Sequence, residues 1–119
     1  MRALLERERP LVGYLFELAG LPVELDALRV EPMADGGMGS LAIAPLGRQY
    51  GSSPSECHFY DQDGVVVSAE LNLDPAGRPF EIDVWKVDSS PTERWPERTE
   101  LIAGPPNNSS KPTPLRGAA

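Results

Sequence analysis

The sequence has one cysteine, one histidine and no long apolar run, and each shortage excludes a class of protein. Cys57 has no second cysteine to pair with, which excludes a secreted scaffold held by internal disulfides. No apolar stretch approaches the roughly 20 residues that a membrane-spanning helix needs. Charged residues at 6–9 interrupt the short apolar start of the chain, so we expect no signal peptide. These shortages together predict a cytoplasmic protein.

Positive charge is also scarce, because 11 Lys and Arg face 18 Asp and Glu, giving a formal net charge of −7. The imbalance lies before residue 89, where 7 basic residues face 15 acidic ones. An acidic surface repels the phosphates of nucleic acids and anionic lipids, so we expect neither a nucleic acid nor a membrane as partner. A basic protein is the natural complement, although many proteins are acidic simply for solubility.

The 13 prolines indicate how the chain is divided. Several follow residue 88, in a stretch that also contains serine and asparagine runs and few spaced apolar residues. Such a segment buries too little apolar surface to offset its conformational entropy. We therefore predict a single domain over residues 1–91, followed by a mobile tail over 92–119.

Apolar spacing predicts one helix over about 9–19, with Leu11, Leu15 and Leu18 on its buried stripe. Pro10 suits the first turn of this helix, and Gly20 suits the residue just past its end. Alternation and turn residues then predict strands at about 27–33, 39–44, 56–61, 65–73 and 80–87.

These elements predict an α+β fold with one N-terminal helix packed on a five-stranded antiparallel meander sheet. Pro32 favours an edge position for the first strand, and its exposed edge leaves the oligomeric state open. Residues 45–55 form a long loop, which we interpret as a candidate mobile flap.

The stretch 80–88 nearly alternates apolar and charged residues, so Ile82 and Val84 point to one face of the sheet and Trp85 to the other. If the apolar faces of the last two strands coincide, Glu70 lies beside Asp83, whereas a two-residue slip places it beside Trp85. A three-residue turn at 62–64 would add residues 58 and 60 to the face of Trp85, and a two- or four-residue turn would invert that choice. The candidate binding residues are therefore Trp85, Asp83, Glu81, Glu70, Tyr60 and His58.

Few residues indicate catalysis or metal binding, and we expect no cofactor, no metal and no catalytic residue. His58 is the single histidine, and Cys57 beside it points to the opposite face of the strand, which prevents a thiol–imidazole pair. Carboxylates beside Trp85 could act as an acid and a base, but solvated charges on an open sheet are the commoner case. The glycines at 36–39 lack the sequence context of a phosphate loop and indicate a turn.

Three segments carry a resemblance: Asp35-Gly36-Gly37-Met38-Gly39-Ser40-Leu41, Asp61-Gln62-Asp63-Gly64-Val65, and the run from Phe80 to Pro91. Together they resemble a family of small bacterial proteins of unknown function. In that family a glycine–methionine turn precedes a sheet ending in a Phe-Glu-x-Asp-x-Trp-Lys-Val-Asp block. The resemblance covers about residues 10–91. It implies a bacterial cytosolic domain and brings no activity or catalytic residue.

Two functional hypotheses follow. The first is a non-catalytic module that binds a basic protein through the acidic and aromatic sheet face, for example an immunity protein that neutralises a cationic toxin. The second is a small enzyme or small-ligand-binding protein that uses the carboxylates under the 45–55 loop. The single histidine and the lack of an evident nucleophile favour the first. If the 45–55 loop or the tail carrying Trp95 covered the face of Trp85, that residue would belong to a second core layer instead.

Overall fold

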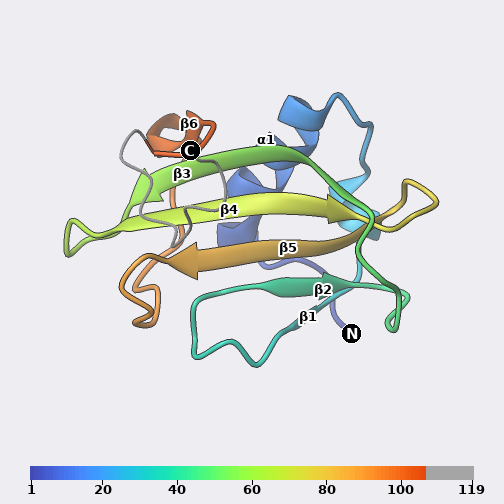
Figure 1. The fold of residues 1–119 in the computed structure, drawn as a ribbon, viewed down its shortest axis with the longest axis horizontal. Helices are drawn as coiled ribbons and strands as arrows, with labels where there is room; N and C mark the ends of the chain where they lie inside the picture. Colours follow the sequence, from blue (N-terminus) through green and yellow to red (C-terminus); the bar gives the residue numbers. More distant parts are fainter. Residues whose placement is uncertain (107–119) are drawn as a thin grey trace.

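The computed structural model describes residues 1–106, which form one antiparallel sheet with a helix packed on one face (Figure 1). The sheet has six strands in the order β1-β2-β5-β4-β3-β6. The helix is α1, Arg9–Ala19, and short 3₁₀ turns lie at Glu6–Glu8, Leu25–Ala27 and Arg98–Glu100. The strands are β1 (Val30–Pro32), β2 (Leu41–Ile43), β3 (Ser52–Tyr60), β4 (Val66–Leu73), β5 (Pro79–Lys86) and β6 (Ile102–Ala103). The α+β class is confirmed.

Helix α1 begins and ends where its sequence pattern predicts. Gly20 adopts φ +70°, a left-handed conformation that closes the helix, and the N–H of Leu21 donates to Phe16. Leu11 and Leu15 are fully buried against the sheet, as predicted. Leu18 is 38% exposed, so its assignment to the buried stripe was wrong. The buried side chains of α1 all lie before Leu18, between Leu11 and Phe16.

The predicted simple meander was wrong, because β2 pairs with β5 and not with β3. Only β3, β4 and β5 follow one another as a meander. The Ser40 hydroxyl explains the placement of β2: it accepts the N–H of Val84 at 2.9 Å and lies 3.1 Å from the carbonyl oxygen of the same residue. This contact docks the start of β2 on the free edge of β5. The edge position predicted for β1 is confirmed.

The predicted strand count of five was also wrong, and the sixth strand comes from the segment expected to be a mobile tail. Strand β6 pairs with His58 and Cys57 of β3, and Leu101 is only 7% exposed. Trp95 packs against the hydrophobic core, which anchors residues 92–106 to the domain. Irregularly spaced apolar anchors of this kind escape a search for periodicity. The remainder of the predicted tail, residues 107–119, lies outside the described residues.

The register of the central strands agrees with the first of the two predicted alternatives. Ala69 lies opposite Val84, and Leu71 lies opposite Ile82, all four facing the helix and buried. The three-residue turn at 62–64 is confirmed by the hydrogen bond from the N–H of residue 61 to the oxygen of residue 65. Cys57 therefore faces the core, where it is fully buried.

The 45–55 loop does not form a flap over the sheet. Strand β3 already begins at Ser52, and Arg48 ties the remaining loop to one end of the sheet. Its guanidinium donates to the Asp74 carboxylate at 3.1 Å and to the carbonyl oxygens of Ile43 and Pro79 at 3.0 and 2.9 Å. A guanidinium that donates to two backbone carbonyls and a carboxylate at once holds a loop more firmly than a single salt bridge does.

Candidate functional site: an acidic and aromatic sheet face

The surface of the sheet opposite α1, here called the outer face, carries cross-strand rows of polar and aromatic side chains. In one row Ser68 lies between His58 and Trp85. In the next row Glu70 has a like charge on each side, and in the third Asn72 lies opposite Glu81. The carboxylate row consists of Glu56, Glu70 and Asp83. The structure thus brings the predicted site residues onto three neighbouring strands.

Glu81 lines the same face, and its pKa reflects both burial and repulsion by the neighbouring carboxylates. Partial burial, the charge of Asp83 and then that of Glu70 raise the pKa of Glu81 above its ordinary value. The Ser53 hydroxyl lies 3.1 Å from a carboxylate oxygen of Glu70 and 2.7 Å from the side-chain oxygen of Asn72. Like charges directly opposite each other destabilise a sheet. The outer face therefore concentrates negative charge in neighbouring rows across three strands.

The aromatic residues of this face differ in exposure. Tyr60 is 52% exposed, and its ring meets that of His58 edge to face at a centroid distance of 6.1 Å. Trp85 is half-buried. The His58 ring is buried and Nδ1 lies 2.8 Å from the carbonyl oxygen of Gly104, so Nδ1 donates there and the ring supports β6. Among the aromatic side chains of this face, Tyr60 is the most exposed.

Trp95 lies on the helix side of the sheet, opposite the outer face. It lines a pocket together with Leu11 of α1 and with Phe59 and Val84, which are buried on the face of the sheet that packs against α1. Trp95 thus belongs to the core layer.

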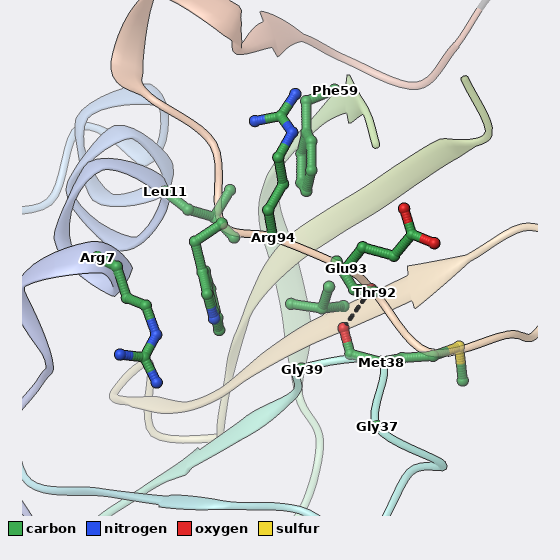
Figure 2. Close-up of a pocket in the computed structure, with 11 residues that line it drawn as sticks. Arg7, Leu11, Gly37, Met38, Gly39, Phe59, Thr92, Glu93 and Arg94 are labelled. Atoms are coloured by element: carbon green, nitrogen blue, oxygen red, sulfur yellow. Dashed lines mark hydrogen bonds between the residues drawn. The ribbon is translucent and has the colours of Figure 1, made fainter. Parts of the chain in front are cut away.

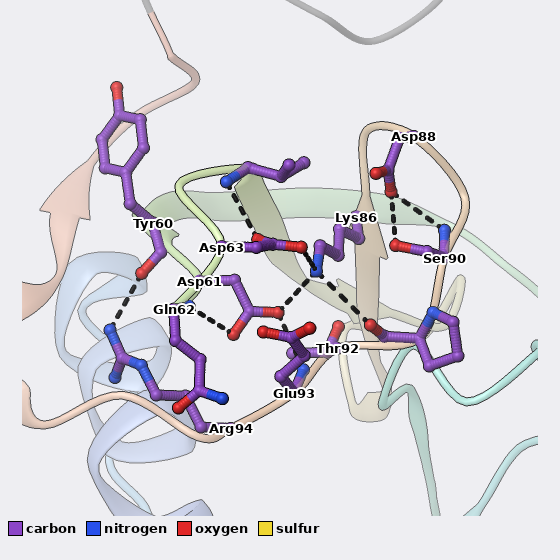
Figure 3. Close-up of polar contacts among 12 residues, drawn as sticks. Tyr60, Asp61, Gln62, Asp63, Lys86, Asp88, Ser90, Thr92, Glu93 and Arg94 are labelled. Atoms are coloured by element: carbon purple, nitrogen blue, oxygen red, sulfur yellow. Dashed lines mark hydrogen bonds and ion pairs between the residues drawn. The ribbon is translucent and has the colours of Figure 1, made fainter.

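A buried charge cluster that the sequence pattern did not predict lies at the other end of β5, around Lys86 (Figure 3). The Lys86 side chain is 1% exposed, and its ammonium lies 2.9 Å from Asp61 and 2.6 Å from Asp63. Asp61 also accepts the backbone N–H of Glu93 at 2.7 Å. The cluster thus joins β5, the turn after β3 and the segment that follows β5. The alternation of β5 could have revealed it, since Lys86 shares the inward parity of Ile82.

The charges within this cluster stabilise one another. Burial alone would raise the pKa of Asp61, but the N–H of Glu93, the ammonium of Lys86 and the N–H of Gln62 outweigh burial and lower it. Burial alone would lower the pKa of Lys86, but hydrogen bonds to Asp63 and Asp61 raise it. Ligand oxygens of Asp61, Asp63 and Glu93 lie within 4.8 Å of one another, close enough to hold a metal ion. The Lys86 ammonium binds two of these carboxylates, so the chain itself supplies the cation.

A family model matches residues 1–96 of the chain. The chain belongs to the DUF6984 family. The description of DUF6984 is a domain of unknown function, which confirms the resemblance to an uncharacterised family and brings no activity. No curated protein and no solved structure matches the chain. Among the described residues, no helix is long and apolar enough to cross a membrane.

The DUF6984 match includes the whole outer face, the Lys86 cluster and the glycine turn at 36–39. In that turn the carboxylate of Asp35 accepts the N–H groups of Met38 at 3.1 Å and of Ser40 at 2.8 Å. Burial alone would raise the pKa of Asp35, but these N–H groups and the Ser40 hydroxyl lower it. The backbone donors that a phosphate would need are therefore occupied by the protein's own carboxylate. This supports the interpretation of the glycines as a turn.

Proposed function

We propose that this protein is a non-catalytic, cytoplasmic protein-binding module that holds a basic protein against its outer face. One observation carries the proposal: the carboxylates of three adjacent strands lie in direct register beside Trp85. Complementary charge speeds encounter and selects partners, and the exposed ring of Tyr60 offers the aromatic anchor typical of an interface. Neutralisation of a cationic toxin is one form that this function would take.

An apolar hollow adjoins the carboxylates and supports the same proposal. It has a volume of about 170 Å³, and Phe80 and Glu81 are among its lining residues. Met33 and Leu46 also line it and are 40% and 53% exposed. Apolar side chains beside a charged rim reproduce the usual anatomy of a protein interface. A basic partner would place an apolar side chain here and its cations over the carboxylates.

The alternative, a small enzyme or ligand-binding protein closed by the 45–55 loop, has less support. Arg48 holds that loop at the end of the sheet, away from the position of a lid. Cys57 faces the core while His58 lies on the outer face, so the two do not form a nucleophile–base pair. No observation specifically favours catalysis.

The proposal is tested by immobilising the full chain and capturing a partner from a lysate of its source cells. A double variant, Glu70→Gln with Glu81→Gln, removes two charges from the outer face with little change in shape. The matched control, Glu6→Gln with Glu24→Gln, removes the same charge from exposed positions elsewhere. We expect a basic protein to be captured by the wild type and by the control but not by the outer-face variant. Trp85→Ala should lose the same protein while its far-UV circular dichroism stays unchanged.

The affinity for the captured protein should also fall as salt concentration rises, because exposed charges more than about 10 Å apart are screened at 0.1 M salt. Equal capture by the wild type and the outer-face variant would contradict the proposal. So would a captured partner that is acidic.

A further inference from the structure

A pocket of about 520 Å³ lies on the helix side of the sheet, away from the outer face (Figure 2). It opens between the 3₁₀ turn before α1, the glycine turn at 37–39 and the segment 92–95. Leu11, Phe59 and Val84 form its floor, and Trp95 lines its wall. Pockets of roughly 300–1,000 Å³ with an apolar lining are typical of sites for small organic molecules. The volume and the lining therefore suit a small ligand with an apolar body.

The walls of this pocket are held in place without a ligand. The Thr92 hydroxyl donates to the carbonyl oxygen of Met38 at 2.7 Å, and the Thr92 N–H donates to that of Gly37 at 3.1 Å. Gly39 has φ +115°, and a Cβ there would lie 3.6 Å from the Trp95 ring. A pre-formed pocket loses less conformational entropy on binding than one that must close around its ligand.

The charge of Arg7 indicates what kind of ligand fits. Arg7 lines the pocket and is exposed. Among the basic residues of 1–106, Arg7 alone has no hydrogen bond or ion pair; the others bind carboxylates or backbone carbonyls (Arg2, Arg9, Arg29, Arg48, Arg78, Lys86, Arg94 and Arg98). In a chain with a formal net charge of −7, such a guanidinium is a scarce site for an anion.

The other charges of the pocket limit the anion to a single charge. Figure 2 places Arg7 and Glu93 at opposite ends of the pocket, so a second negative group near Glu93 would be repelled. The Arg94 guanidinium also lines the pocket but already binds the carbonyl oxygen of Tyr60 at 2.9 Å and Glu100 at 2.6 Å. Among the described residues, only the end at Arg7 offers a guanidinium with no hydrogen bond or ion pair, and its charge also acts on the Glu8 carboxylate.

We propose that this pocket binds a small aromatic monocarboxylate. Its ring packs against Trp95 and the apolar floor, and its carboxylate accepts paired hydrogen bonds from Arg7. A planar fork of donors matches a carboxylate, and an indole favours contact with another ring. The site is separate from the outer face, so the two proposals succeed or fail independently.

The test is an NMR titration of the full, isotope-labelled chain with 2-naphthoate and with its uncharged analogue 2-naphthamide. We expect 2-naphthoate to shift the indole N–H of Trp95 and the amides of Gly37 and Gly39 in a saturable manner. Arg7→Gln should weaken 2-naphthoate about tenfold, the usual effect of losing a charge-assisted hydrogen bond. Arg7→Lys should weaken it less. Arg29→Gln removes the same charge from an exposed position outside the pocket and should leave the affinity unchanged.

The neutral 2-naphthamide should bind more weakly than 2-naphthoate and equally to the wild type and to Arg7→Gln. Three outcomes would overturn the proposal: no shift at these sites with millimolar 2-naphthoate, equal weakening by Arg7→Gln and Arg29→Gln, or equal affinity for the acid and the amide. The amide spectrum of each variant shows directly that it is folded.

Discussion

Strand β5 carries two groups of charges on its opposite faces, and they are organised in opposite ways. On the inner face, the positive charge of Lys86 is buried between the negative carboxylates of Asp61 and Asp63. On the outer face, Asp83 continues a row of like charges across β4 and β3. The charges of the inner group neutralise one another and tie three segments together. The outer group concentrates one sign of charge beside Trp85. The contrast lies between buried charges of both signs, which tie segments of the fold together, and partly exposed charges of one sign, which gather on a single face of the sheet.

The largest expected effect comes from breaking the inner group. Asp61→Ala removes a carboxylate whose side chain is 0% exposed and leaves the Lys86 ammonium buried with one partner fewer. Breaking a buried ion pair from one side costs about 3 kcal/mol or more in the free energy of unfolding. Urea unfolding followed by circular dichroism measures this loss.

Arg78→Ala is the control for this prediction, because Arg78 also pairs with an aspartate but is 72% exposed. It should change the free energy of unfolding by less than about 1 kcal/mol. Equal losses in the two variants would mean that burial does not distinguish the inner group.

The two groups should also respond to pH with opposite sign. The pKa of Asp61 is lowered in the folded state, so its stabilisation is present above about pH 4, its unfolded pKa, and is lost as the pH falls through the folded value. The pKa of Glu81 is raised, first by burial and then by Asp83 and Glu70, so ionised Glu81 destabilises the fold near neutral pH. Glu81→Gln should therefore be more stable than the wild type at pH 7 and converge with it as the pH falls toward about 4.

Asp61→Asn should do the reverse, with its largest deficit at pH 7 and a smaller one at acidic pH. Urea midpoints of the three proteins at several pH values provide the measurement. Parallel curves for all three would remove the distinction between the inner and outer groups.

A smaller effect is expected when charge is removed from the outer face. Glu70→Gln with Glu81→Gln relieves repulsion between neighbouring strands, so the free energy of unfolding should rise by up to about 1 kcal/mol. Thermal unfolding measures the change. A loss of several kcal/mol would show that these carboxylates are structural, and would weaken the proposal that they serve a partner.

The smallest effect expected is on the reactivity of the Cys57 thiol. Because this side chain is fully buried, its rate of labelling measures how often the core opens. Burial, followed by the charge of Glu56, raises the pKa of this thiol to about 12. The folded protein should therefore resist iodoacetamide at pH 8, since the thiolate is the reactive form. Mass spectrometry should show the labelling rate of the outer-face double variant within about twofold of the wild type and that of Asp61→Ala well above it. Equal acceleration in both variants would contradict the separation of the two groups.

Much of the central sheet could be predicted from local pattern. The alternation of β4 and β5 predicted which of their residues face the core, and one of the turn lengths left open at 62–64 placed Tyr60 and His58 on the face of Trp85, as the structure shows. These steps succeed because adjacent strands joined by a short turn have few alternative registers. The positions of the candidate site residues follow from the same rule.

The features that were missed depend on contacts between distant segments. Strand β2 reaches β5 through Ser40, β6 reaches β3 after a proline-rich stretch, and Arg48 fixes the loop predicted to be a flap. None of these contacts has a periodic signature, because each depends on one or two side chains whose partners are far along the chain. Local pattern therefore assigned the elements but not the order in which they assemble.

The sequence by itself determined the helix, the faces of the central strands and the acidic character of the outer face, since these follow from the spacing of apolar residues and the count of charges. Only the tertiary structure decided that Lys86 is an internal counter-ion and that Trp95 and Trp85 lie on opposite sides of the sheet. The physical reason is that the environment of a charge or an indole is set by long-range packing. Neighbours in sequence do not define it.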